Sequence, residues 1–222
     1  LTAVMRLKDI HPAVKVTLLI VVFLFAAAVL LLTAGRPLTG YLRTVTETAV
    51  EMGAPVYEYS DGEDQPEDGT IRKSEVAVPA TGSRYGTIIC DDIGLKAPLY
   101  YGDTDKILSR GAGQYTGSGL PGEGRIILVG AHDVGYFEVL ENAKKGQEIN
   151  VRTSYGDFVY RITDLRVEDV SYISARDLQK ADGEKLVLYT CYPFGEVFDK
   201  SDRRYFVTAE KVSGPVLVED QQ

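Results

Sequence analysis

The chain has 222 residues, 45% of them hydrophobic, and a formal net charge of −8. A chain of this size can hold one sizeable hydrophobic core but hardly two full domains, so we expect one folded domain. Residues 1–36 carry a net charge of +3, which leaves −11 for the remainder. A folded part this acidic repels phosphates, which argues against nucleic acid as a partner.

The first feature along the chain is the uncharged apolar run at 16–34, VTLLIVVFLFAAAVLLLTA. A helix of this length spans roughly 30 Å of hydrocarbon, so we predict a transmembrane helix at 16–34. A cleavable signal peptide is the alternative, but its apolar region has only about 7 to 15 residues. Arg6, Lys8 and Lys15 favour a cytoplasmic N-terminus at 1–15. We therefore expect a single-pass protein of the cell membrane with its C-terminal part outside the cell.

The segment that follows, 35–75, is predicted to be a juxtamembrane stretch and an acidic linker. Its part at 58–69, EYSDGEDQPEDG, has six acidic residues and no basic one. Such a stretch repels itself and has little apolar surface to bury, so it stays extended and solvated. The folded domain is accordingly expected at 76–222.

The pattern at 76–222 is one of short β-branched and aromatic runs separated by glycine, which predicts a mainly β domain with a closed or sandwiched sheet. Helical patterns are short and occur at 104–110 and 136–143. The glycine-rich segment at 111–124 lacks Gly-Lys-Ser/Thr and is predicted to be a turn-rich surface loop rather than a phosphate-binding loop. The predicted strands are YGTIICD, APLYYGD, RIILVGA, EINVRTS, DFVYRITDLRVEDV, KLVLYTC and RYFVTAEKV.

Histidine and cysteine are scarce, which narrows the possible chemistry. The histidines are His11, on the predicted cytoplasmic side, and His132; the cysteines are Cys90 and Cys191. These residues have no zinc-site spacing, and no loop has the EF-hand spacing, so we expect no cofactor or metal and leave calcium dependence open. Cys90 lies inside a strand run and is expected to be a structural thiol, whereas Cys191 ends a strand and can project into a cleft.

A thiol that attacks an amide must first become a thiolate, and a neighbouring imidazolium or guanidinium favours that form. His132 ends one strand run, as Cys191 ends another. Arg203 and Arg204 open the next strand, which an antiparallel hairpin brings beside Cys191. Side chains alternate along a strand, so only one arginine should share the cleft, and the pattern does not say which. Each residue also has an ordinary alternative: a loop histidine, a surface ion pair or a buried thiol.

The stretch at 186–194, LVLYTCYPF, resembles the TLxTC signature of sortases, especially the TCYPF form of class D. Ala131-His132-Asp133 falls where that family has its histidine, and Arg204-Tyr205-Phe206-Val207 resembles its arginine strand. The likeness extends over about residues 84–212. The order of anchor, linker, histidine, cysteine and arginine is also that of the family.

This resemblance implies a closed eight-stranded sortase-type β-barrel with short helices, behind an N-terminal transmembrane helix. It implies a cysteine transpeptidase in which Cys191 attacks an LPxTG-like sorting signal of a secreted protein and forms a thioacyl intermediate. His132 would serve as general acid and base, and Arg204 would stabilise the oxyanion or hold the substrate. The acceptor would be an amine of a peptidoglycan precursor or, in a pilin-polymerising sortase, of a pilin.

A non-enzymatic, membrane-tethered β module that binds wall polymer or a partner is the alternative from a different class. In that case Cys191 would be an ordinary buried thiol, so thiol reactivity separates the two. Substrate-contacting loops are expected within 163–184.

Overall fold

The computed structural model describes residues 16–26, 69–180, 183–195 and 202–220. The chain divides into two compact units, Leu1–Thr46 and Glu47–Gln222. In the first unit, residues 16–26 form an α-helix. Across the described ranges, none of the helices combines the length and apolar character needed to cross a membrane. The predicted segments 1–15 and 27–34, and the linker as far as residue 68, lie outside those ranges.

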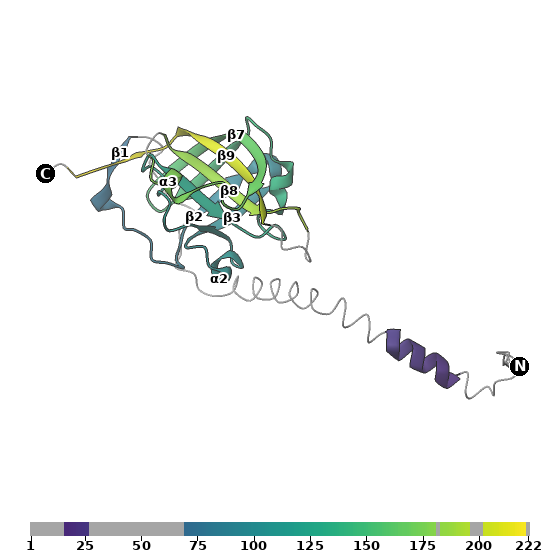
Figure 1. The fold of residues 1–222 in the computed structure, drawn as a ribbon. Coiled ribbons are helices and arrows are strands. Elements are labelled where there is room, and N and C mark those ends of the chain that lie inside the picture. The colour runs from purple at the N-terminus through teal and green to yellow at the C-terminus, as the bar shows by residue number, and fades with distance from the viewer. Residues whose placement is uncertain (1–15, 27–68, 181–182, 196–201, 221–222) are drawn as a thin grey trace, which may run out of the picture. The chain divides into compact units, whose positions relative to one another are not determined.

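The second unit is built around a closed eight-stranded barrel with the strand order β2-β3-β4-β5-β8-β9-β7-β6, and Figure 1 shows β7, β9 and β8 side by side along one wall. This confirms the expected mainly β fold with a closed eight-stranded barrel. The strands are β2 (Arg84–Cys90), β3 (Leu95–Tyr101), β4 (Ala112–Gln114), β5 (Ile126–Gly130), β6 (Glu148–Thr153), β7 (Asp157–Asp169), β8 (Lys185–Cys191) and β9 (Arg203–Ser213).

Side-chain alternation determines which residues of each strand fill the barrel. In β8, Leu186 and Leu188 are fully buried members of the core cluster, whereas Tyr189 is half-buried and Cys191 is exposed. Successive strand residues point to opposite faces, so Tyr189 and Cys191 share the outer face of the wall. The core inside the barrel therefore holds β8 in place while leaving the side chain at its end accessible from outside.

The glycine-rich segment 111–124 differs from the surface loop that its sequence predicts. Strand β4 lies within it and is fully buried. A Cβ added to Gly111 would lie 2.5 Å from the Pro98 carbonyl oxygen. A Cβ added to Gly113 would lie 2.5 Å from the Gly102 carbonyl oxygen. The prediction was wrong at 112–114, because these glycines permit close backbone packing, a role that glycine shares with turns. Turns do occur at 116–117 and 121–122.

The short helices are accessories to the barrel. Helix α2 (Asp105–Leu108) and the 3-10 helix η4 (Glu138–Asn142) fall within the two predicted helical stretches. Helix α3 (Ala175–Leu178) was not apparent from the pattern, because it has only one turn; a capping box between Ser174 and Asp177 begins it. The other 3-10 turns are η2 (Lys73–Glu75) and η3 (Asp91–Ile93).

A separate two-stranded sheet joins the two ends of the folded unit. Strand β1 (Thr70–Arg72) pairs in parallel with β10 (Val216–Val218), and both lie beside the barrel in Figure 1. The sequence places residues 70–72 in the linker 35–75, but here they form a strand. Three residues with little apolar character are too few for a strand pattern to be recognised. Ordered pairing thus begins before residue 76.

The end of the barrel where β8 begins is held by a buried carboxylate, that of Glu184. It accepts hydrogen bonds from the backbone amides of Gly122 (3.0 Å) and Gly124 (2.9 Å) and from the Tyr160 hydroxyl (2.6 Å). The Lys211 ammonium lies 3.7 Å away. Glu184 therefore ties the connection between β4 and β5 to the start of β8.

We predict that Glu184→Ala lowers the free energy of unfolding by about 3 kcal/mol, because it leaves two buried backbone donors and a hydroxyl without their acceptor. Chemical denaturation monitored by circular dichroism measures this loss. Glu210→Ala is the matched control: Glu210 is exposed on β9 at the same end of the barrel, and its loss should change stability by no more than about 0.5 kcal/mol. Equal effects of the two changes would contradict the role given to Glu184.

Candidate active site

Cys191 is the last residue of β8, and its cross-strand neighbour is Arg204 of β9. Residues directly opposite in an antiparallel pair project from the same face, so Cys191 and Arg204 share one. Arg203 projects to the other face, where its guanidinium lies 5.8 Å from the centre of the Tyr192 ring. The register thus answers a question that the sequence leaves open: Arg204, not Arg203, accompanies Cys191.

His132 reaches the same end of the barrel through β5, which runs parallel to β8 with Gly130 opposite Tyr189. The pairing continues past the strand, because the Ala131 amide donates to the Tyr189 carbonyl (3.3 Å) and the Thr190 hydroxyl donates to the Ala131 carbonyl (2.8 Å). His132 directly follows Ala131, and Cys191 directly follows Thr190. The sequence-predicted residues His132, Cys191 and Arg204 therefore come together at adjacent ends of β5, β8 and β9.

Asp133 is a further residue of this site, and sequence reasoning gave it no role. It is only 7% exposed, and its carboxylate accepts a hydrogen bond from the Gly195 amide at 3.0 Å. The bond joins the segment after β5 to the segment after Cys191. The signal available in the sequence was only its position next to His132, which does not by itself distinguish a buried carboxylate from a solvated one.

The Cys191 thiol is subject to opposing electrostatic effects. Partial burial raises its pKa, the Arg204 guanidinium lowers it, and the Asp133 carboxylate raises it again; the net effect is a raised pKa. The neutral thiol therefore predominates near neutral pH, and the thiolate fraction grows as pH rises. Arg204 is the group that favours the nucleophilic form.

Cys90 is a different kind of thiol. It is fully buried in the barrel core, and burial is the main cause of its raised pKa. Both cysteines are free. The expectation that Cys90 is a structural thiol is confirmed.

The outer wall beside Cys191 is aromatic. The rings of Tyr189 and Phe206 stack with centroids 6.0 Å apart, and Tyr172 packs on Phe206 at 5.2 Å. The Arg166 guanidinium lies 5.2 Å from the centre of the Tyr172 ring. A Cβ at Gly130 would lie 2.7 Å from the Tyr189 ring, so glycine leaves the room that this ring occupies. An apolar wall next to an accessible thiol can hold a peptide side chain.

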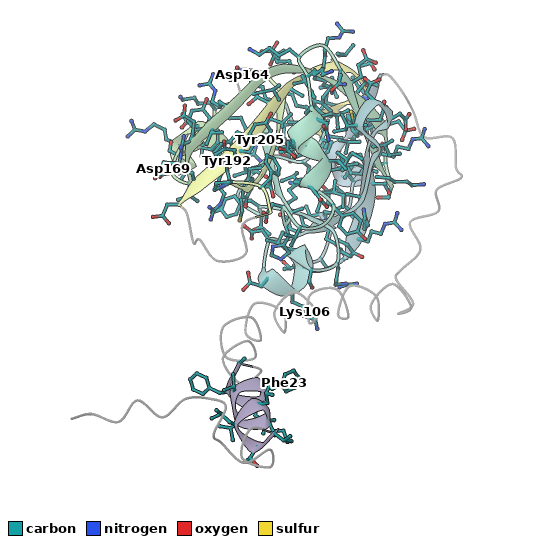
Figure 2. The ribbon with its side chains drawn as sticks, turned by 90° about the vertical axis from the view of Figure 1, so that its right-hand side faces the viewer. Phe23, Lys106, Asp164, Asp169, Tyr192 and Tyr205 are labelled. Atoms are coloured by element: carbon teal, nitrogen blue, oxygen red, sulfur yellow. The ribbon has the colours of Figure 1, made fainter. Side chains whose placement is uncertain are left out.

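The loop region predicted at 163–184 is shorter than expected. Strand β7 continues to Asp169, so the connection to β8 covers 170–184, of which 181–182 are not described. The predicted strand DFVYRITDLRVEDV, at 157–170, agrees with β7, so the predicted loop range began inside a strand that the sequence already indicated. Tyr172 and α3 belong to the connection; Figure 2 shows Asp169, where β7 ends, with Tyr192 and Tyr205 at this end of the barrel.

In the described ranges, no group of three or more histidine, cysteine, aspartate and glutamate side chains could hold a metal ion. The chemistry that the site offers is that of a thiol, an imidazole and a guanidinium on neighbouring strand ends, with a buried carboxylate behind them.

Comparisons with known proteins show the family to which the chain belongs. The family model of the sortase domain matches residues 88–212. Sortase D of Bacillus subtilis (strain 168) is 32% identical over 136 residues, which are 61% of this chain and 67% of that protein.

Solved structures of similar fold are also sortases. Sortase C from Clostridium perfringens SM101 has a TM-score of 0.52 and 27% identity, covering 60% of this chain and 72% of that one. A structure of Clostridium perfringens sortase C with the C-terminal cell wall sorting motif has a TM-score of 0.53 at 27% identity, with 60% and 72% covered. A Clostridium perfringens sortase D5 transpeptidase, 21% identical with a TM-score of 0.54 over 63% of this chain and 86% of that one, shares the fold.

We predict that Arg204→Ala slows alkylation of Cys191 by iodoacetamide at about pH 8, because loss of the guanidinium raises the pKa of the thiol. Mass-spectrometric mapping of both cysteines over a pH series measures the rate, with buried Cys90 as the internal unreactive reference. Arg203→Ala is the matched control and should not change the dependence of the Cys191 alkylation rate on pH. The assignment of Arg204 to the thiol fails if the two variants behave alike.

Proposed function

Because the chain belongs to the sortase family, we propose that it is a cysteine transpeptidase that cleaves an LPxTG-like sorting signal and transfers the protein to an amine acceptor. The observation that carries this proposal is the strand register. Cys191 lies opposite Arg204 on β9, and the pairing of β5 with β8 brings His132, which follows Ala131, to the same level. An accessible thiol beside an imidazole and a guanidinium is the arrangement that acyl transfer through a thioester requires.

In the first half-reaction, the Cys191 sulfur attacks the carbonyl carbon of the threonine in the sorting signal. A C–S bond forms, the threonine–glycine C–N bond breaks, and the amine leaves with a proton from His132. The product is a thioacyl enzyme. The raised pKa of the Cys191 thiol implies that attack depends on the minor thiolate form, so the rate of this step should increase with pH until leaving-group protonation limits it.

In the second half-reaction, the acceptor amine attacks the thioester carbonyl. His132 accepts the proton of the amine, an amide bond forms, and Cys191 is released. The Arg204 guanidinium, on the same face as Cys191, would stabilise the oxyanion that develops in both steps or hold the substrate carbonyl.

The sorting signal is proposed to lie along the outer face where Tyr189 and Tyr172 pack over the buried Phe206 ring. The presence of a C-terminal cell wall sorting motif in the Clostridium perfringens sortase C structure supports a substrate of this kind. The acceptor is proposed to be a primary amine of a peptidoglycan precursor, with a pilin lysine as the alternative. The two differ in the molecule that carries the amine, not in the chemistry at Cys191.

The membrane location is proposed from the uncharged sequence at 16–34. A tether there, with the catalytic part outside the cell, would keep the enzyme on the surface where secreted substrates pass. Sharing a surface raises the effective concentration of enzyme and substrate without any new contact.

We predict that Cys191→Ala abolishes transpeptidation and that His132→Ala lowers kcat/KM by about 10³-fold, within the range expected for loss of a general acid and base. The assay incubates the full chain in detergent with an LPxTG-type peptide and a small amine, and follows the ligated product by mass spectrometry. Cys90→Ala should retain most activity. Product formation by the Cys191→Ala variant would refute the proposed mechanism.

Arg204→Ala is expected to lower kcat by about 10²- to 10³-fold, as for the loss of an oxyanion-stabilising donor. Arg203→Ala, one residue away on the opposite face of β9, should retain most activity. Single-turnover rates of the two variants with the same peptide compare them directly. A greater loss for Arg203→Ala would reverse the assignment.

A further inference from the structure

The hydrogen bond between Asp133 and Gly195 connects the two segments that carry the reacting groups. Asp133 follows His132 directly, and Gly195 lies four residues after Cys191. The bond between the Asp133 Oδ2 and the Gly195 amide, 3.0 Å long, therefore closes a link from the histidine to the chain beyond the cysteine. Gly195 has a φ of +71°, a left-handed conformation that glycine adopts readily and that aims this amide at the carboxylate.

Burial of Asp133 makes this contact more than an incidental surface bond. A carboxylate that is only 7% exposed carries a desolvation cost, which hydrogen bonding to a backbone amide offsets. Hydrogen bonds with a charged partner contribute more than neutral ones. The contact is thus a charge-assisted hydrogen bond made largely out of reach of water.

We propose that Asp133 is a positioning residue, whose carboxylate holds the segment after Cys191 against the segment that carries His132 and keeps the two reacting groups in register. The proposal rests on the transpeptidase function proposed above and adds a fourth residue to it. Asp133 acts through the backbone of Gly195 and through its charge, without touching the substrate.

The charge of Asp133 acts on the thiol together with the other groups around it. The groups that face Cys191 are Arg204 on β9, His132 and Asp133 after β5, and Tyr189 on β8 itself. Of these, Arg204 favours the thiolate and Asp133 opposes it. Removing the Asp133 charge while keeping its hydrogen bond should therefore make the thiolate more abundant at a given pH.

Two substitutions separate the hydrogen bond from the charge. Asp133→Asn keeps an oxygen that accepts from the Gly195 amide but removes the charge, whereas Asp133→Ala removes both. Glu138→Gln is the matched control, because Glu138 is an exposed acid in η4 of the same connection. All are made in the full chain, with melting temperatures measured alongside.

For Asp133→Asn we expect iodoacetamide to alkylate Cys191 about twofold faster near pH 8, because removing the negative charge lowers the pKa of the thiol and the gain in thiolate outweighs its somewhat lower nucleophilicity. The pH profile should move to lower pH, and Glu138→Gln should not move it. Alkylation needs no sorting signal, so this readout stands even if the proposed transpeptidation fails.

For Asp133→Ala we expect kcat/KM for the LPxTG-type peptide to fall at least about tenfold, the effect of losing a charge-assisted hydrogen bond, while Asp133→Asn stays within about threefold of the parent. An unchanged alkylation profile in Asp133→Asn, or full kcat/KM in Asp133→Ala, would overturn the proposal. Failure of the transpeptidase proposal would be seen differently, as formation of the ligated product by the Cys191→Ala variant.

Discussion

The site depends on the position of β8 between β5 and β9. Parallel pairing with β5 and antiparallel pairing with β9 fix the height of Cys191 on the barrel wall, and the buried side chains of Leu186 and Leu188 fix which face it takes. A slip of one residue in either register would move Cys191 to the interior face or give it Arg203 as a neighbour. The barrel core therefore sets the geometry of the thiol before any loop contributes.

Electrostatics at the strand ends then determine how reactive this thiol is. Burial and Asp133 favour the neutral form and Arg204 favours the thiolate, so the resting enzyme holds a thiol that is mostly protonated near neutral pH. Such a nucleophile requires a partner that exchanges protons during the reaction, and His132 is placed for that on the neighbouring strand end. Asp133, whose charge opposes the thiolate, also links the segment after β5 to the segment after Cys191 through its hydrogen bond with the Gly195 amide.

Much of this arrangement could be predicted from the sequence. The strand runs around Cys191, His132 and Arg204 are long and clearly β-branched, and each side chain follows or opens a run, so their meeting at one rim was foreseeable. Strand β4 was not, because its Ala-Gly-Gln sequence has the composition of a turn and its strand conformation comes from close packing of Gly111 and Gly113 against neighbouring backbone. Asp133 was missed because its burial depends on tertiary contacts, and Arg204 could be separated from Arg203 only by the register.

The most direct test of the central claim is to trap the thioacyl intermediate. The full chain in detergent is mixed with an LPxTG-type peptide in the absence of an amine and analysed by intact-mass spectrometry followed by peptide mapping. The account predicts an adduct with the mass of the peptide up to and including threonine, carried by Cys191 and released when an amine is added. Peptide cleavage with the adduct on a residue other than Cys191 would contradict it. So would cleavage without any adduct in the first turnover of both the parent and the His132→Ala variant.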